Sequence, residues 1–175
     1  MKNKIFITAF VILTLLFSSC VWMYSTRPGT IPPHIKSVSI ENTENNTAEF
    51  NLGEDFTVLL IDKMNLENLL PLTDASVANS LIYTTIKSIR DQVFSYDETE
   101  VVKEYKLSIS IDFRWYDAIN DKDIMKKTLS DYEIYYSDTY NNSLSPDDQV
   151  TRETALESLK DKMADKVITE LTSQW

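Results

Sequence analysis

The clearest pattern in the chain is a strict alternation of apolar and polar residues over residues 105–116. Tyr105, Leu107, Ile109, Ile111, Phe113 and Trp115 hold one set of alternate positions, and Lys106, Ser108, Ser110, Asp112, Arg114 and Tyr116 hold the other. Because successive side chains of a β-strand point to opposite faces, this period predicts a long strand with one buried and one wet face. The polar segment 117–123 predicts a turn, and residues 124–136 predict the partner strand.

Two amphipathic segments predict helices. The apolar stripe of the first, residues 52–65, consists of Leu52, Phe56, Leu59, Leu60 and Met64. Asn51 stands at its expected N-cap, with Glu54 three residues later. The apolar stripe of the second, near the C-terminus, consists of Leu156, Leu159, Met163, Val167 and Leu171. Ser145 predicts the N-cap of this second helix and Pro146 its first position.

The remaining apolar segments complete a sheet. Residues 35–42 and 79–93 predict strands by their alternation, and residues 66–72 predict a short strand that its proline restricts to a sheet edge. The segments 41–49 and 137–145 are polar and predict loops. The order of elements predicts an α+β fold, in which two helices pack on one face of a mostly antiparallel four- to five-stranded sheet.

The first twenty residues predict export and lipidation. After two lysines, residues 5–17 contain eleven apolar side chains, and two serines lead to Cys20, the only cysteine. A short apolar stretch followed by small residues is typical of a secretory signal, and the residues before Cys20 resemble a lipobox. We therefore expect residues 1–19 to be removed and Cys20 to be lipidated. Residues 20–34 then form a tether, and residues 35–175 form the domain.

Two other interpretations of this segment remain. Residues 5–24 contain only four Ser or Thr side chains and are long enough for an uncleaved spanning helix, and Cys20 is alternatively an ordinary buried thiol. A multiply acylated cysteine anchors firmly, because each buried methylene contributes about 0.8 kcal/mol. The lipidated and the uncleaved forms both leave the remaining chain outside the cytoplasmic membrane.

Composition narrows the class of protein. The 156 residues after the predicted signal suit one domain with a core. They carry 15 Lys or Arg against 27 Asp or Glu, a net charge of −12, whereas nucleic acids select basic patches. We therefore expect no nucleic-acid partner. With its cysteine lipidated, the domain has no internal disulfide and is held by packing alone.

The residues that catalysis requires are scarce. His34 is the only histidine and lies in a proline-rich connector, where we expect a solvated side chain. The chain has no Cys/His set for zinc, and its two glycines make no phosphate-binding loop. Asp117, Asp121 and Asp123 flank the predicted turn, but without the spacing and glycine of a calcium-binding EF-hand. We predict a protein that is not an enzyme and holds no metal or cofactor.

The chain resembles the lipopolysaccharide-assembly lipoprotein family, LptE, in the form found in Bacteroidetes-type bacteria. The most specific likeness is the segment Ile31-Pro32-Pro33-His34-Ile35-Lys36-Ser37-Val38-Ser39-Ile40. Cys20 with Tyr24-Ser25, Gly29, Asn45-Asn46, the amphipathic segment 52–64, the strand 105–111, the segment 132–135 and the closing helix also fit. The likeness covers the whole mature chain, and order and spacing carry it more than any one motif.

The resemblance implies a function. LptE-like proteins are lipid-anchored at the periplasmic face of the outer membrane. They fill the lumen of a large β-barrel, LptD, help it assemble and are thought to contact lipopolysaccharide. The alternative is an accessory periplasmic lipoprotein of another envelope complex. A membrane-anchored enzyme or small-ligand binder is a third class.

Contact with lipopolysaccharide requires a local cationic site on this acidic chain. Lys106 and Arg114 share the polar face of the long strand but are eight residues apart, about 26 Å, so they cannot clamp one phosphate together. Lys103, Lys126 and Lys127 are candidates to join one of them across the hairpin. The alternative for each is an ordinary solvated charge.

Overall fold

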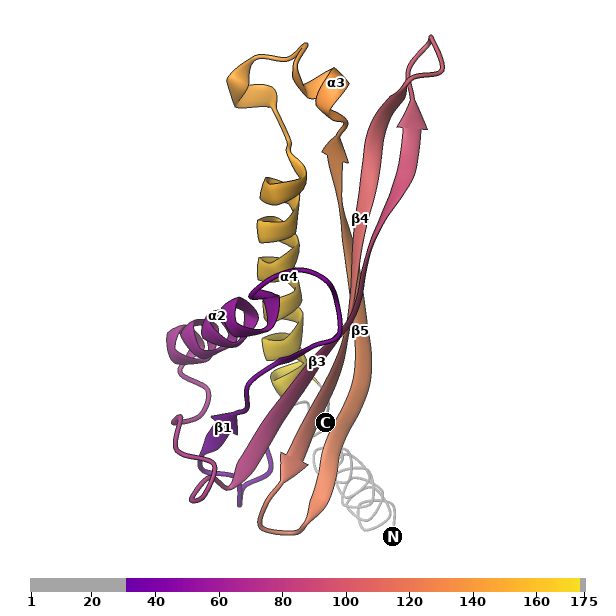
Figure 1. The fold of residues 1–175 in the computed structure, drawn as a ribbon. Helices are drawn as coiled ribbons and strands as arrows, with labels where there is room; N and C mark the ends of the chain where they lie inside the picture. Colours follow the sequence, from indigo (N-terminus) through magenta and orange to yellow (C-terminus); the bar gives the residue numbers. More distant parts are fainter. Residues whose placement is uncertain (1–30, 174–175) are drawn as a thin grey trace, which may run out of the picture.

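The computed structural model describes residues 31–173 (Figure 1). The predicted signal segment 1–19, the lipidation site Cys20 and all of the tether before residue 31 lie outside the described residues. The described part of the chain therefore consists of the domain and the last four residues of the predicted tether.

Three long strands form an antiparallel meander. They are β3 (Ser80–Tyr96), β4 (Val102–Asp117) and β5 (Lys122–Tyr136). β4 lies in the centre, paired with β3 on one side and β5 on the other. The predicted alternation of β4 is confirmed, since Leu107, Ile109, Ile111, Phe113 and Trp115 are all buried and the residues between them are half-buried.

Two short strands complete the five-stranded sheet at the outer edge of β3. β1 (Val38–Ile40) and β2 (Glu44–Asn45) both run parallel to β3, opposite Ser80–Ile82 and Thr85–Ile86 respectively. Parallel neighbours require a crossover connection, which α2 (Leu52–Glu67) supplies. The predicted α+β class and mostly antiparallel sheet are confirmed.

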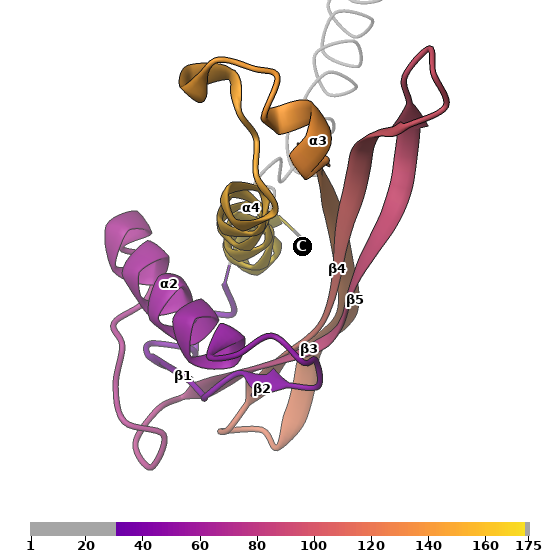
Figure 2. The same cartoon turned by 45° about the horizontal axis from the view of Figure 1, so that its top comes forward.

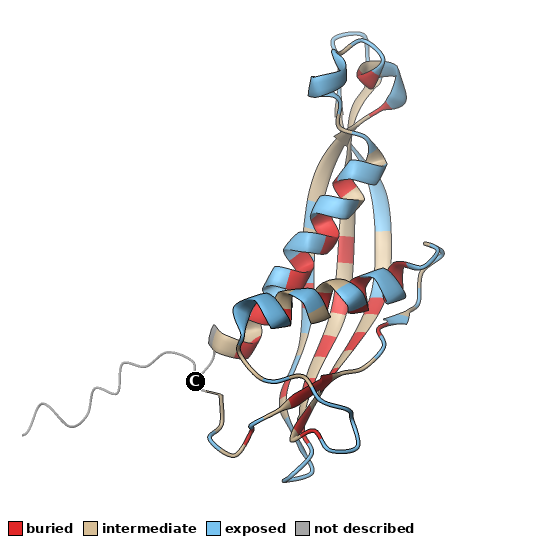
Figure 3. Ribbon diagram, turned by 90° about the vertical axis from the view of Figure 1, so that its left-hand side faces the viewer, coloured by how far each residue is buried: buried red, intermediate tan, exposed pale blue. Residues whose placement is uncertain are grey.

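The two long helices cover one face of the sheet, and their buried positions face it (Figure 3). α4 (Arg152–Ser173) lies along β4 and β5, and α2 crosses against α4 near β1 and β2. Phe56, Leu60, Met64, Leu159 and Met163 bring apolar side chains from the helices into one core with the inner face of β4. The opposite face of the sheet carries no helix of the described chain (Figure 1).

Charged groups fix the start of α4 over the sheet. The guanidinium of Arg152 donates to Asp91 of β3 at 3.1 Å and to Glu49 of the β2–α2 connection at 2.6 Å. These bonds raise the pKa of Arg152, so it stays charged. The hydroxyl of Tyr135 donates to the same Asp91 at 2.8 Å. One arginine therefore ties a helix, a strand and a loop together.

The predicted start of the last helix is wrong. Ser145 and Pro146 open only a 3₁₀ turn, η2 (Pro146–Asp148), and α4 begins at Arg152. Thr151 caps α4 instead: its Oγ1 accepts from the N–H of Thr154 at 3.2 Å, and its own N–H donates to Thr154 Oγ1 at 3.0 Å. This reciprocal pair is a capping box with threonine at the third position, which lacks the usual Glu or Gln signal.

Two other local predictions are corrected. Asn51 precedes α2, but it is in the left-handed conformation with φ 56° and its side chain makes no cap hydrogen bond. The predicted strand 66–72 is absent, because α2 continues to Glu67 and Asn68 then ends it, its N–H donating to the Met64 carbonyl. Leu72 keeps only an isolated bridge to Val38. A short leucine-rich run fits a helix end as well as a strand.

Both predicted polar loops contain ordered structure. The first includes β2, and the second includes a short helix, α3 (Asp138–Asn141). In the first loop, Asn45 accepts from Thr47 and donates to the Glu49 carbonyl at 2.7 Å. In the second, the buried side chain of Asn141 bonds both the N–H and the carbonyl of Val150 at 3.0 Å. In each loop an asparagine side chain replaces the backbone pairing that a strand would supply.

Gly53 is required by a close approach between α2 and the β1–β2 connection. A Cβ at this position would lie 2.5 Å from the carbonyl oxygen of Thr43. Three buried threonine hydroxyls fill the same contact, with Thr43 Oγ1 bonded to Thr84 at 2.6 Å and to Thr57 at 3.0 Å. A larger residue in place of Gly53 would separate the helix from the sheet edge.

The side chain of His34 is 37% exposed, so it is partly solvated as we predicted, but it also has a buried partner that we did not predict. Its Nε2 lies 2.6 Å from Oδ2 of Asp117, which is fully buried at the end of β4. Asn120 and the N–H of Ile119 also donate to this carboxylate. Burial acts to raise its pKa, but the hydrogen bonds prevail and lower it from the ordinary 3.8 to about 2. The end of the tether is thereby fastened to the β4–β5 turn.

We predict that Asp117→Asn removes this fastening. The loss of a buried charged acceptor should lower the free energy of unfolding by about 1–3 kcal/mol. Since the folded pKa of Asp117 is depressed, its contribution is complete above about pH 4 and is lost as the pH falls towards 2. Urea unfolding between pH 7 and pH 2 tests this. Asp62→Asn, on the exposed side of α2, is the control, and equal stability of the two variants would contradict the prediction.

Candidate functional site

The open face of the sheet is the candidate functional site. We define it as the face opposite α2 and α4. From β4 it takes the even-numbered polar residues Lys106, Ser108, Ser110, Asp112, Arg114 and Tyr116. The strand register adds the neighbours of these residues: Tyr83, Thr85, Ser88 and Arg90 from β3, and Lys126, Thr128, Ser130 and Tyr132 from β5. Hydroxyl, aromatic and cationic groups therefore dominate the face.

The lower part of this face holds a mutually neutralised cluster. Arg114 pairs with Asp123 at 2.5 Å and lies near the rings of Tyr83 and Tyr116, 5.3 and 4.9 Å from their centroids. The bond to Asp123 raises the pKa of Arg114. Lys126 lies directly opposite Arg114 in the register. Arg114 is thus charged but already committed to a carboxylate.

Asp112 is the neighbouring acid in this cluster. It accepts from Thr128 at 2.7 Å and faces the ammonium of Lys87 at 3.4 Å. The Thr128 hydrogen bond first, and the Lys87 charge second, hold its pKa below the ordinary value. The cations of the lower part of the face consequently have acids close by.

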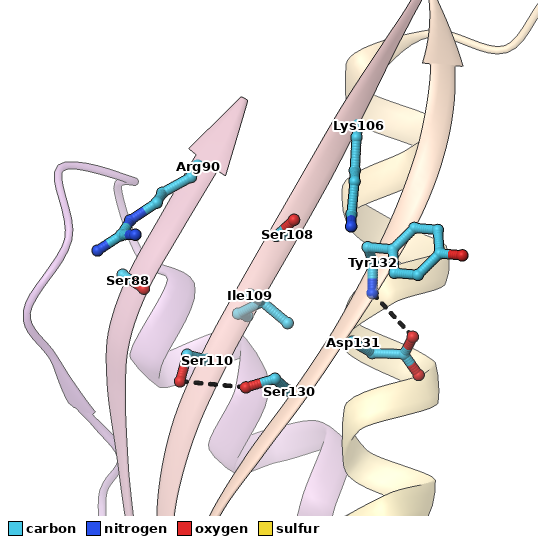
Figure 4. Close-up of a pocket in the computed structure, with 9 residues that line it drawn as sticks. All are labelled: Ser88, Arg90, Lys106, Ser108, Ile109, Ser110, Ser130, Asp131 and Tyr132. Atoms are coloured by element: carbon cyan, nitrogen blue, oxygen red, sulfur yellow. Dashed lines mark hydrogen bonds between the residues drawn. The ribbon is translucent and has the colours of Figure 1, made fainter. Parts of the chain in front are cut away.

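The upper part of the open face differs, because its cations have no acid partner. Arg90 and Lys106 line a shallow hollow of about 370 Å³ with the hydroxyls of Ser88, Ser108, Ser110 and Ser130 (Figure 4). Within residues 31–173, no carboxylate lies within 4 Å of Arg90 or Lys106. The Lys106 ammonium instead lies 4.1 Å from the centroid of the Tyr132 ring. Asp131 also lines the hollow, but its carboxylate pairs with Lys166 of α4 at 2.9 Å. The hollow thus offers two cations without an acid partner, among hydroxyl groups and one carboxylate that is already paired.

The register places these two residues near each other on neighbouring strands, although the guanidinium of Arg90 points away from Lys106 in the structure (Figure 4). Arg90 lies opposite Ser108, two residues from Lys106 on the same face of the adjacent strand. Such diagonal neighbours are roughly 7–8 Å apart, within reach of one anion for two long side chains. Lys106 and Arg114, the pair emphasised by sequence, are far apart on one strand. Arg90 and Lys106 are therefore the pair whose backbone positions would let both side chains turn towards one phosphate.

Two of the predicted cations lie on the other face. Lys127 is opposite the buried Phe113 and pairs with Glu170 of α4 at 2.7 Å. Lys103 also lies towards the helices, 4.8 Å from the centroid of the Tyr140 ring. Neither can join Lys106 or Arg114, whereas Lys126 can.

Sequence reasoning did not select Arg90. Ser88 and Arg90 are two residues apart, and this spacing was the available signal that both lie on the open face. A bulge between Ile86 and Ser88 shifts the register there and breaks the period of two.

The acidic residues of the β4–β5 turn do not converge. Asp117 holds the turn and His34, Asp121 accepts from the Tyr116 hydroxyl, and Asp123 pairs with Arg114. In the part of the chain that the structure describes, no group of three His, Cys, Asp or Glu is placed to hold a metal ion. Over the same residues, no helix is both long and apolar enough to cross a membrane.

Comparison with solved structures identifies the fold. The chain is similar to the PelC dodecamer from Paraburkholderia phytofirmans (TM-score 0.55, 12% identity, covering 83% of this chain and 95% of that chain). It is similar to the rare lipoprotein B from Shewanella oneidensis (0.54, 17%, 78% and 93%) and the minor lipoprotein from Acinetobacter baumannii (0.53, 15%, 78% and 92%). At these identities the likeness shows the fold alone. A search of the curated proteins gives no match.

The fold thus places the domain in an architecture that bacterial lipoproteins use. The family follows from sequence: the family model described as "LptE: Lipopolysaccharide-assembly" matches residues 35–171. The chain therefore belongs to the LptE family, so the predicted family is confirmed, and its Bacteroidetes-type form stays a prediction.

Proposed function

We propose that this protein is an outer-membrane lipoprotein of lipopolysaccharide transport. It acts as the plug and assembly partner of an LptD-type β-barrel, is anchored on the periplasmic side through Cys20, and contacts lipopolysaccharide. The family match over residues 35–171 is the observation that carries this proposal. Such a protein works by filling the barrel and binding lipopolysaccharide, and it catalyses no reaction.

The two-faced sheet suits a plug. The interior of a transmembrane barrel is polar, so a domain that fills it needs polar groups on the surface that meets the wall. The open face supplies hydroxyls, tyrosines and charges along the length of β4, and no described helix covers it. The helices on the other face keep the core closed, so the domain needs no partner to complete it.

The upper hollow supports direct contact with lipopolysaccharide. Lipid A phosphates are anions beside sugar hydroxyls, and Arg90, Lys106 and the four serines offer cations beside hydroxyl donors and acceptors. The net charge of −12 on the residues after the predicted signal opposes an anion at long range. That repulsion is screened beyond about 8–10 Å at physiological salt. Two unneutralised cations at contact distance can therefore outweigh it locally.

Affinity purification of the full-length tagged chain from detergent-solubilised outer membrane tests the plug role. We expect a large β-barrel protein to co-purify in stoichiometric amount. Depletion of this chain should reduce the amount of correctly assembled barrel in the membrane. Purification with another envelope complex and no barrel would instead support the accessory-lipoprotein alternative and contradict the proposal.

Substitutions in the upper hollow test lipopolysaccharide binding. We expect Arg90→Ala with Lys106→Ala to weaken binding at least about tenfold, because each charge-assisted hydrogen bond contributes about 1.5–3 kcal/mol. Arg114→Ala should have a smaller effect because Asp123 already neutralises that guanidinium. Titration with purified lipopolysaccharide at two salt concentrations measures these differences. Lys36→Ala, an exposed lysine beside β1, is the control, and unchanged binding in the double variant would exclude the hollow.

Lipidation is tested by Cys20→Ser. This variant should lose incorporation of labelled fatty acid and should no longer fractionate with the outer membrane, because only the Cys20 thiol can take up the diacylglyceryl group. Ser19→Ala keeps a small residue before the cleavage site and should be labelled normally. Normal labelling of Cys20→Ser would refute the lipoprotein assignment.

A further inference from the structure

The tip of the β3–β4 hairpin carries the densest group of exposed apolar side chains in the described domain. We define the tip as residues 93–101. Phe94 is 56% exposed, Tyr96 61%, and Val93 and Val101 45% each. The tip projects beyond α4, beside α3 (Figures 1 and 2). Four exposed apolar residues within nine positions are too concentrated to be the scattered apolar residues of an ordinary surface.

Hydrogen bonds hold the tip in one conformation. Oδ1 of Asp97 accepts from the N–H groups of Thr99 and Val101 at 2.8 and 2.9 Å, and the N–H of Asp97 donates to the Val101 carbonyl at 2.8 Å. Below the turn, the Ser95 hydroxyl donates to Glu104 at 2.5 Å. The tip is therefore a pre-organised surface, and binding through it costs little ordering entropy.

The charge of the tip distinguishes between kinds of partner. Asp97, Glu98 and Glu100 surround the end of the hairpin, and none of them lies within 4 Å of a cation among residues 31–173. Entry into a bilayer would carry these carboxylates into an apolar medium at high cost. A protein recess with an apolar floor and a cationic rim would instead complement both features.

The position of the tip agrees with a protein partner. The described chain begins at the opposite end of the sheet, where His34 bonds Asp117. Tyr96 is opposite Val102 at one end of β4, and Ser80 is opposite Asp117 at the other. The 16 residues of β4 separate the two ends by about 50 Å. A membrane anchor that precedes residue 31 therefore joins the domain at the end away from the tip.

We propose that the β3–β4 tip is a docking prong that seats in an apolar, cationically rimmed recess of the barrel partner. This inference rests on the proposed function and adds the surface and the chemistry of the contact. Phe94 and Tyr96 supply the buried anchors, and Glu98 and Glu100 meet the basic rim.

Two double variants of the full-length lipoprotein test the prong. Phe94→Ser with Tyr96→Ser removes the anchors, and Glu98→Lys with Glu100→Lys reverses the charge. Each should reduce the barrel recovered with the tagged chain at least about tenfold, with unchanged thermal unfolding because all four side chains are exposed. Phe50→Ser is the matched control, since Phe50 is a 90% exposed aromatic residue that precedes α2 and is not part of the tip, and it should leave recovery unchanged.

Photo-crosslinking identifies what the tip touches. A benzoylphenylalanine at position 94 should crosslink to the barrel in living cells. Crosslinks from position 94 to lipid alone, or equal loss of barrel with Phe50→Ser, would overturn the prong. Recovery of the barrel by wild type and by both tip variants alike would overturn the prong and leave the proposed function standing. Absence of any barrel with wild type would overturn both.

Discussion

The alternation of β4 is the constraint on which the rest of the structure depends. Leu107, Ile109, Ile111, Phe113 and Trp115 form a continuous dry surface that α2 and α4 must cover. A shift of one residue in its pairing would turn all of these side chains to the solvent and bring Lys106, Asp112 and Arg114 into the core. The register of β4 therefore determines both where the helices pack and which polar residues the open face presents. The same strand that builds the core also presents the candidate site.

The two faces of the molecule use their charges differently. On the helical side, several cations are paired internally: Lys63 lies 2.8 Å from Asp161 and 2.6 Å from Asp165, and Lys127 is paired with Glu170. On the open face, Arg90 and Lys106 have no such partners within the described residues. The negative net charge of the whole chain is thus a poor guide to the electrostatic potential at one place on its surface. An anion that is repelled by the molecule as a whole still meets a cationic surface at the upper hollow.

The sequence predicted the parts that depend on periodicity. The alternation of residues 105–116, the core stripes of both helices and the class of fold follow from the spacing of apolar residues, and all appear in the structure. It did not predict the parts that depend on contacts between distant residues. Arg90 was not identified because a bulge interrupts the alternation of β3. Lys127 was grouped with Lys106 and Arg114 because the register of β5 against β4 cannot be read from the sequence. The partner of His34 lies 83 residues away. The capping threonines of α4 were passed over because a serine and a proline nearby matched a commoner signal.

The position of α4 in the chain bears on how the protein reaches its folded state. The β3–β4–β5 meander joins neighbours in sequence, so its strands can pair before α4 takes part. The part of its apolar inner face that α4 covers stays exposed until residues 152–173 pack against it, whereas α2 precedes the meander in the chain. A sheet that α2 alone covers is therefore the expected intermediate when the chain folds from its N-terminus. Deletion of α4 would leave this apolar part of the sheet permanently exposed. Binding of a chaperone is of most use to the protein before α4 packs.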